Sequence, residues 1–153
     1  KIGATFHKTD RGGDITFHGY GQMVAYPIFD LSRLGIGLRD YIYGLEEAVI
    51  ATIAHWDIKG GRSEGATGVW CDTKGALSKI CAIGVKASHF VTMHGLALNV
   101  NTDLDYFTYI NPCGFTDRGV TSIEALTGGR VDMETVKRRF VKEMERIFDI
   151  EIK

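Results

Sequence analysis

The chain has 153 residues, of which 44% are hydrophobic and 24% are charged, and its formal net charge is −1. This length and balance are typical of a single globular domain with one hydrophobic core. The near-neutral charge argues against a general nucleic-acid or membrane-surface binder, and no apolar run reaches the length of a membrane span. Three cysteines, Cys71, Cys81 and Cys113, form no CxxC motif, so neither a disulfide framework nor a metal site is indicated and a reducing cytoplasm is expected.

The first part of the chain combines a glycine-rich stretch with an apolar run. Four glycines stand between Arg11 and Gln22, and they let a backbone pass close to a neighbour without matching a Walker A or GxGxxG pattern. Arg11 and His18 flank these glycines and are candidates to face a ligand, although a glycine-rich turn between strands is an equal alternative. The apolar run Gln22–Leu31 predicts a buried strand with Pro27 near an edge or bulge.

Amphipathic helices are predicted in the middle and at the end of the chain. Apolar residues recur every three or four positions between Leu38 and Trp56, so this stripe is expected to face the core. Asp132 is the expected N-cap of the last helix, and a shorter helix is predicted over 121–126, closed by two glycines. Acidic residues lie toward the start of the first helix, where the helix dipole favours them: Asp40, Glu46 and Glu47.

Strands are predicted between these helices, after a polar stretch over 60–67 that is expected to be a loop. Gly68–Asp72 and Leu77–Val85 flank a Lys74-Gly75 turn and predict a hairpin, and 91–101 predicts a further strand. Lys79 lies in the second hairpin strand, directly before a run of apolar residues. It is either an edge residue with its charged end in water or a functional amine. His94 in the later strand is more typical of a structural histidine than of a catalyst. The pattern is mixed α/β.

A cysteine stands on a predicted turn within Ile110–Phe115. Pro112 fixes its own φ and biases the preceding residue toward extended geometry, while Gly114 permits angles that other residues avoid. The Cys113 thiol is therefore held out from the chain, which suits a nucleophile, although the turn alone favours an inert cysteine.

The chain resembles the octanoyl (lipoyl) transferases of lipoate biosynthesis, which are relatives of lipoate ligases and biotin ligases. The resemblance rests on four blocks: Arg11-Gly12-Gly13 through His18-Gly19 with Gly21-Gln22, Lys79 to Gly84, His94 to Asn99, and Asn111-Pro112-Cys113-Gly114. It implies an α/β fold of the α+β type, with a mixed, largely antiparallel sheet flanked by helices and an acyl pocket near the glycine-rich block.

The same resemblance implies an acyltransferase of protein lipoylation. The enzyme would move an octanoyl or lipoyl group from acyl carrier protein, through a thioester on Cys113, to a lysine of lipoyl domains in 2-oxoacid dehydrogenases and of glycine cleavage H protein. Lys79 would be the partner of the cysteine, and no cofactor, metal, nucleic acid or membrane partner is implied. The implied substrate-binding positions are Arg11, Gly12, Gly13, Asp14, Ile15, Thr16, Phe17, His18, Ala82, Ile83, Gly84, His94, Gly95, Leu96 and Ala97.

The chain departs from the family pattern at two places, and two other functions compete. Tyr20 stands where the family usually has proline, and residues 1–153 are expected to form one catalytic domain without the family's N-terminal segment. An ATP-dependent lipoate or biotin ligase would share the fold and the Lys79 strand, but such ligases need no nucleophilic cysteine. An inactive module that only binds the carrier or lipoyl domains is the remaining alternative.

Overall fold

The computed structural model describes residue 3 and residues 5–13, 15–110 and 119–152. Within these ranges, an antiparallel sheet has the strand order β1-β5-β4-β3-β2, and a short sixth strand pairs with β4 in parallel. The strands are β1 (Gln22–Ala25), β2 (Gly60–Ser63), β3 (Ala66–Thr73), β4 (Ala76–Ser88), β5 (Val91–Asn99) and β6 (Gly119–Val120). The helices are α1 (Leu31–Leu34), α2 (Leu38–Ala54), the 3-10 helix η1 (Leu104–Tyr109), α3 (Ile123–Thr127) and α4 (Met133–Phe148).

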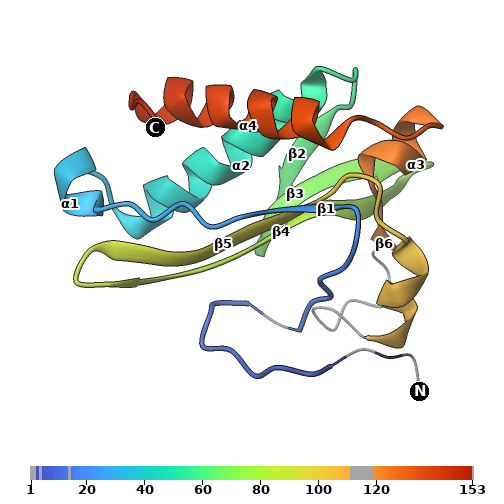
Figure 1. Ribbon diagram of the computed structural model, residues 1–153, viewed down its shortest axis with the longest axis horizontal. Helices are drawn as coiled ribbons and strands as arrows, with labels where there is room; N and C mark the ends of the chain where they lie inside the picture. The colour runs from blue at the N-terminus through green and yellow to red at the C-terminus, as the bar shows by residue number, and fades with distance from the viewer. Residues whose placement is uncertain (1–2, 4, 14, 111–118, 153) are drawn as a thin grey trace.

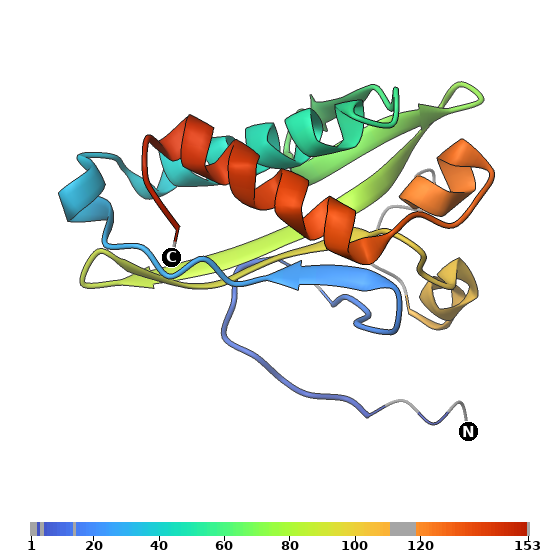
Figure 2. The same cartoon turned by 45° about the horizontal axis from the view of Figure 1, so that its top comes forward.

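Helices α2 and α4 cover one face of the sheet. The residues of this chain that precede β1 (5–13 and 15–21), its N-terminal segment, cross the opposite face (Figures 1 and 2). Gly44 lies where α2 meets α4, because a Cβ there would come within 2.5 Å of the Phe148 ring. Leu45, Val49 and Ile53 of α2 are fully buried in the core, as predicted for this apolar stripe, whereas Leu38 at the start of the helix is 38% exposed. The core is therefore formed between the sheet and this helical layer, which leaves the other face for the N-terminal segment. None of the helices in the described part of the chain is long and apolar enough to cross a membrane.

The predicted hairpin is confirmed and is closed by a tight turn. Thr73 pairs with Ala76, so the loop consists of Lys74 and Gly75, whose φ angles are 59° and 87°. Two positive φ values in a two-residue loop match the twist of antiparallel strands. Asp132 also caps α4 as predicted, since its carboxylate accepts a hydrogen bond from the Thr135 backbone N–H at 2.9 Å.

The structure differs from the sequence-based predictions at several local elements. The expected loop over 60–67 contains strand β2, which pairs with β3 at the edge of the sheet. The expected strand over 22–31 ends at Ala25, because Asp30 instead caps α1 by accepting from the Ser32 and Arg33 backbone N–H groups. Helices α1 and η1 were not predicted.

Glu46 was expected near the start of α2, where the helix dipole favours an acidic residue, but it lies elsewhere in the helix. It is buried in the middle of the helix, where its carboxylate accepts the Gly68 backbone N–H at 3.0 Å and the Arg62 Nε–H at 2.9 Å. Its role is therefore to join the helix to strands β2 and β3, where it satisfies a buried donor that would otherwise be unpaired.

Candidate active site

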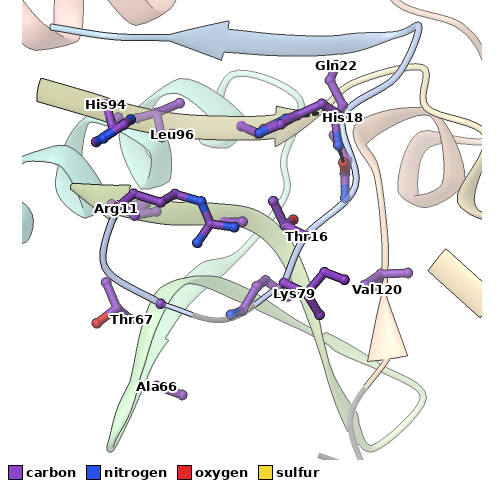
Figure 3. A pocket seen from close by; sticks show the side chains of 18 of the residues that line it. Arg11, Thr16, His18, Gln22, Ala66, Thr67, Lys79, His94, Leu96 and Val120 are labelled. Carbon is purple, nitrogen blue, oxygen red and sulfur yellow. Dashed lines mark hydrogen bonds between the residues drawn. The ribbon is translucent and has the colours of Figure 1, made fainter. Parts of the chain in front are cut away.

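A cavity of about 420 Å³ lies between the sheet and the N-terminal segment. Its walls come from β3, β4 and β5, from β6, and from residues 11–22. The volume falls within the range of about 300–1,000 Å³ that is usual for small-molecule sites. Figure 3 shows labelled side chains from these elements around the same hollow, with Arg11 extending over β4.

Two paired glycines let other segments approach the sheet closely at this cavity. Gly84 of β4 lies opposite Gly95 of β5. A Cβ on Gly84 would come within 2.5 Å of the Gly12 carbonyl oxygen, and one on Gly95 would come within 2.0 Å of the Ala25 carbonyl oxygen. Gly12 also donates its backbone N–H to the Val85 carbonyl at 3.2 Å. The absence of a side chain at Gly84 therefore allows the N-terminal segment to lie across the sheet over the cavity, and its absence at Gly95 allows the end of β1 to approach β5.

A β-bulge turns Lys79 toward the cavity. Val69 pairs with Cys81 while Trp70 pairs with Lys79, so Ile80 is the extra residue on β4. Ile80 and Cys81 both contribute to the core on the helix side. Regular alternation would place Lys79 on that same side as Cys81, and the bulge shifts it to the cavity lining instead.

The Lys79 side chain lies against an aromatic ring. Its Nζ is 4.6 Å from the centroid of the buried Trp70 ring, whose Nε1–H donates to the Ala66 carbonyl at 3.0 Å. A cation over an indole at this distance is attracted by about 0.5–2 kcal/mol. Gly68 lets β3 approach β4 closely, because a Cβ there would lie 2.5 Å from the Cys81 carbonyl oxygen. The indole, itself fixed by a hydrogen bond, therefore orients the amine within the cavity.

His94 reaches the cavity through an unusual backbone conformation. Its φ is 63°, which is uncommon for a residue other than glycine and interrupts the alternation of β5. The His94 Nε2 lies 2.9 Å from Asp10 Oδ1, and Lys86 Nζ donates to the other oxygen of Asp10. Hydrogen bonds from Lys86 and His94 lower the pKa of Asp10 to about 2. Asp10 thus ties the N-terminal segment to both β4 and β5 at the rim of the cavity.

A second polar cluster lies at the other end of the cavity. Gln22 Nε2 donates to the Phe17 carbonyl at 3.0 Å and to Asn99 Oδ1 at 2.9 Å, while its Oε1 lies 3.2 Å from His18 Nδ1. Asn99, which is buried, donates in turn to the Thr121 carbonyl at 3.0 Å. This cluster joins the glycine-rich segment, β5 and the residues that follow β6.

The structure brings most of the predicted site residues together in one cavity. Its lining includes Lys79, Arg11, Gly13, Ile15, Thr16, His18, Ala82, Ile83, Gly84, His94, Gly95, Leu96 and Ala97. Gly12 and Phe17 are not part of the lining: Gly12 bonds to β4, and Phe17 stacks on Tyr106 with ring centroids 4.9 Å apart. Asp14 and Cys113, with the rest of the Asn111–Phe115 turn, lie outside the described residues.

Several other residues line the cavity that were not predicted from the sequence. These are Gln22, Tyr26, Gly65, Ala66, Thr67, Trp70, Asn99, Phe107, Gly119 and Val120. Gln22 and Asn99 stand within the sequence stretches that carry the resemblance to the family. That position could have marked them as site residues. Trp70 could also have been predicted from the sequence, because a two-residue loop at Lys74-Gly75 fixes the hairpin register and places Trp70 opposite Lys79.

The two described cysteines are poor nucleophiles. Burial raises the pKa of the Cys71 thiol to about 11, and it raises the pKa of the fully buried Cys81 thiol as well. A thiol reacts as its thiolate, so both are expected to be inert near neutral pH. Among the described residues, no three His, Cys, Asp or Glu side chains are grouped so that they could hold a metal ion.

The turn at Tyr20 has a geometry that would also fit the family's usual proline. The Gln22 backbone N–H donates to the Gly19 carbonyl at 3.3 Å, and Gly21 has a φ of 81°. These features fit a type II turn, whose second position favours proline and whose third requires glycine. Tyr20 occupies the second position with its side chain fully in solvent. Proline would therefore also fit the position that Tyr20 occupies.

Solved structures share this fold. The chain superposes on a bi-partite lipoate protein ligase from Thermoplasma acidophilum with a TM-score of 0.69 at 15% identity, covering 94% of this chain and 58% of that one. A biotin protein ligase from Aquifex aeolicus gives a TM-score of 0.65 at 16% identity, covering 84% and 53%. At such identities the likeness concerns the fold alone, and it confirms the predicted α/β class with a largely antiparallel sheet.

Curated sequences are much more similar to the chain. It is 59% identical over 145 residues to an octanoyltransferase of Bacteroides fragilis, covering 94% of this chain and 65% of that protein. An octanoyltransferase of Parabacteroides distasonis is 54% identical over 148 residues, covering 95% and 67%. The chain thus spans about two thirds of the length of these relatives. The family model of the lipoyl protein ligase A/B catalytic domain matches residues 1–145, and the chain belongs to that family.

Proposed function

We propose that this chain transfers an octanoyl or lipoyl group from acyl carrier protein to a lysine of a lipoyl domain, through a thioester on Cys113. The observation that carries the proposal is the placement of Lys79, which a bulge and an indole ring hold at a cavity of about 420 Å³. The similarity to proteins named octanoyltransferase supports the nature of the acyl group.

The residues on either side of the cysteine turn support a place for Cys113 at this cavity. Phe107, in the helix that precedes the turn, lines the cavity, and so does Gly119 directly after the undescribed residues. Described residues before and after the stretch that holds Cys113 therefore both belong to the cavity wall. Cys71 and Cys81 are buried with raised pKa values, which leaves Cys113 as the cysteine suited to attack.

The reaction would proceed in two exchanges. In the first, the Cys113 sulfur bonds to the acyl carbon, the carbon–sulfur bond to the carrier breaks, and a proton goes to the departing carrier thiol. In the second, the amine of the acceptor lysine bonds to the same carbon, gives up a proton, and releases the Cys113 thiol. The first exchange is nearly even in free energy and the second converts a thioester to an amide, so no ATP is needed.

Lys79 would contribute more than a charge beside the thiol. A cysteine with a pKa of about 8.5 is ~3% thiolate at pH 7, and lowering that pKa by about two units would raise the fraction roughly 25-fold. Intrinsic nucleophilicity would fall roughly 6- to 10-fold over the same change, given a Brønsted slope of about 0.4–0.5. Because the net gain is only a few-fold, we also assign to Lys79 the transfer of protons to and from the sulfur atoms of the two thiols.

The testing experiment is an ATP-free assay with octanoyl carrier protein as donor and an apo lipoyl domain as acceptor. Wild type is expected to transfer the acyl group, and Lys79→Ala is expected to lose transfer by about 100-fold or more. Lys142→Ala, at an exposed site on α4, is the matched lysine control and should behave as wild type. Transfer that requires ATP and free octanoate would instead show a ligase. Binding of the lipoyl domain with no transfer under either condition would show a binding module.

A further inference from the structure

The hydrogen bonds around Gln22 have a fixed direction, set by backbone groups. The Thr121 carbonyl can only accept, so the Asn99 group facing it at 3.0 Å is the amide Nδ2. Asn99 Oδ1 then accepts from Gln22 Nε2, which also donates to the Phe17 carbonyl. Gln22 Oε1 is therefore the remaining oxygen, and the Gly19 backbone N–H donates to it at 3.3 Å, which agrees with this assignment.

This direction determines the tautomer of His18. Its Nδ1 lies 3.2 Å from Gln22 Oε1, an acceptor, so Nδ1 carries the hydrogen. In the neutral ring, Nε2 then holds the lone pair. His18 lines the cavity (Figure 3) and is exposed, so this imidazole belongs to the cavity mouth.

We infer that His18 accepts a proton through Nε2 from the amine that attacks the thioester, and that Gln22 and Asn99 are the residues that position it. The inference rests on the proposed function and deepens it. As the amine nitrogen bonds to the acyl carbon, one of its protons passes to Nε2 and the thiolate leaves. The resulting imidazolium keeps its Nδ1–H on Gln22, so the positive charge faces an amide oxygen.

The same chain of bonds also reaches the strand that carries Lys79. Asn99 is 4% exposed, and it is bonded to the Thr121 carbonyl. The Thr121 backbone N–H donates in turn to the Lys79 carbonyl at 3.0 Å, beside the pairing of Lys79 with Val120. Asn99 thus holds the residues after β6 in register with Lys79 while it orients His18 through Gln22. Removing its amide donor would disturb the register of these residues with Lys79.

The tautomer can be measured directly on the wild-type chain. With ¹⁵N-labelled histidine, long-range ¹H–¹⁵N spectra distinguish the protonated from the unprotonated ring nitrogen at a pH where the ring is neutral. The His18 signals are assigned by their loss in His18→Asn. An Nδ1–H tautomer is expected, and an Nε2–H tautomer would overturn the inference. This readout does not depend on activity.

The variants then separate a proton acceptor from a structural histidine. His18→Asn keeps a donor at the δ position for Gln22 and lacks any group at Nε2, so transfer should fall by about 100-fold or more. Transfer at the wild-type rate in His18→Asn would mean that the hydrogen bond to Gln22 is all that His18 provides, and the inference would be wrong.

Asn99→Asp tests the positioning residues, and Asn101→Asp is its matched control. Asn101 also donates through Nδ2 to a backbone carbonyl, that of Val131 at 2.9 Å, and Asn101 does not line the cavity. Asn99→Asp keeps the oxygen that accepts from Gln22 Nε2 and loses the donor to the Thr121 carbonyl. It should therefore leave the His18 tautomer unchanged and lower transfer at least tenfold, whereas Asn101→Asp should change neither. Equal effects of the two variants would contradict a positioning role. If Asn99→Asp does not fold, the wild-type spectrum and His18→Asn still decide the question. If the wild type itself transfers nothing, the proposed function fails while the spectra still report the His18 tautomer.

Discussion

Replacing Gly84 by alanine should separate the function of the cavity from the stability of the fold. The added Cβ would lie 2.5 Å from the Gly12 carbonyl oxygen and 2.9 Å from Arg11 Cδ, so the segment above the sheet must move away. That movement breaks the Gly12–Val85 hydrogen bond, which contributes about 0.5–1.5 kcal/mol. Alanine in place of glycine within a strand raises the free energy of unfolding by roughly 0.5–1 kcal/mol. The net change in the free energy of unfolding should therefore lie within about 1 kcal/mol of zero, while the cavity loses its roof at Arg11.

Gly95→Ala is the matched comparison, since the two glycines face each other across β4 and β5. Its Cβ would lie 2.0 Å from the Ala25 carbonyl at the end of strand β1, where the backbone is fixed by pairing. Forcing a methyl group into such a contact should cost about 1–3 kcal/mol. Urea denaturation and the ATP-free transfer assay, run on both variants, measure the two effects. The reasoning would be refuted if Gly84→Ala lost as much stability as Gly95→Ala, or if it transferred octanoyl groups as wild type does.

Three further predictions concern separate parts of the chain. At pH 8 a thiol with a pKa of about 11 is ~0.1% thiolate, so peptide mapping after iodoacetamide should find Cys71 and Cys81 labelled about a hundredfold more slowly than a free thiol; rapid labelling of either would contradict their burial. Hydrogen bonds from Lys86 and His94 lower the pKa of Asp10 from 3.8 to about 2. The free energy of unfolding of wild type should therefore exceed that of Asp10→Asn by a constant amount above pH 3.8, and this difference should disappear as the pH falls toward 2. Thermal melts of both chains from pH 6 to pH 2 test this, and a difference that grows in acid would refute it. Tyr20→Pro should raise the free energy of unfolding by about 0.4–1 kcal/mol, because the type II turn already fits proline; destabilisation in urea would show that the turn is of another type.

The elements predicted correctly are those whose signals are local. The cap at Asp132 and the turn at Lys74-Gly75 act on neighbouring residues, and the apolar stripe of α2 repeats along one helix. Strand β2 lacks such a signal, since Gly60–Ser63 is short and half glycine and becomes a strand through its pairing with β3. Glu46 was assigned to the helix dipole because its partners, Arg62 and Gly68, are brought to it only by the tertiary fold.

At the site, the residues could be predicted from the sequence, whereas the directions of their side chains could not. The motif blocks indicated Lys79 and His94, but strand alternation would place both on the core side of the sheet. A bulge at Ile80 and a left-handed backbone at His94 turn them toward the cavity, and neither feature has a signature in the alternating pattern. Gln22 and Asn99 were overlooked for a related reason, because their value lies in bonds between segments distant in sequence.

If an acyl group passes through a thioester on this chain, the intact mass of the chain after incubation with octanoyl carrier protein should reveal it. Without ATP and without acceptor, wild type is expected to gain the mass of one octanoyl group, sensitive to hydroxylamine and located by peptide mapping on Cys113. Adding an apo lipoyl domain should remove the adduct and acylate the domain. An adduct that persists in Cys113→Ser on Cys71 or Cys81, or transfer to the domain with no dependence on Cys113, would contradict the account.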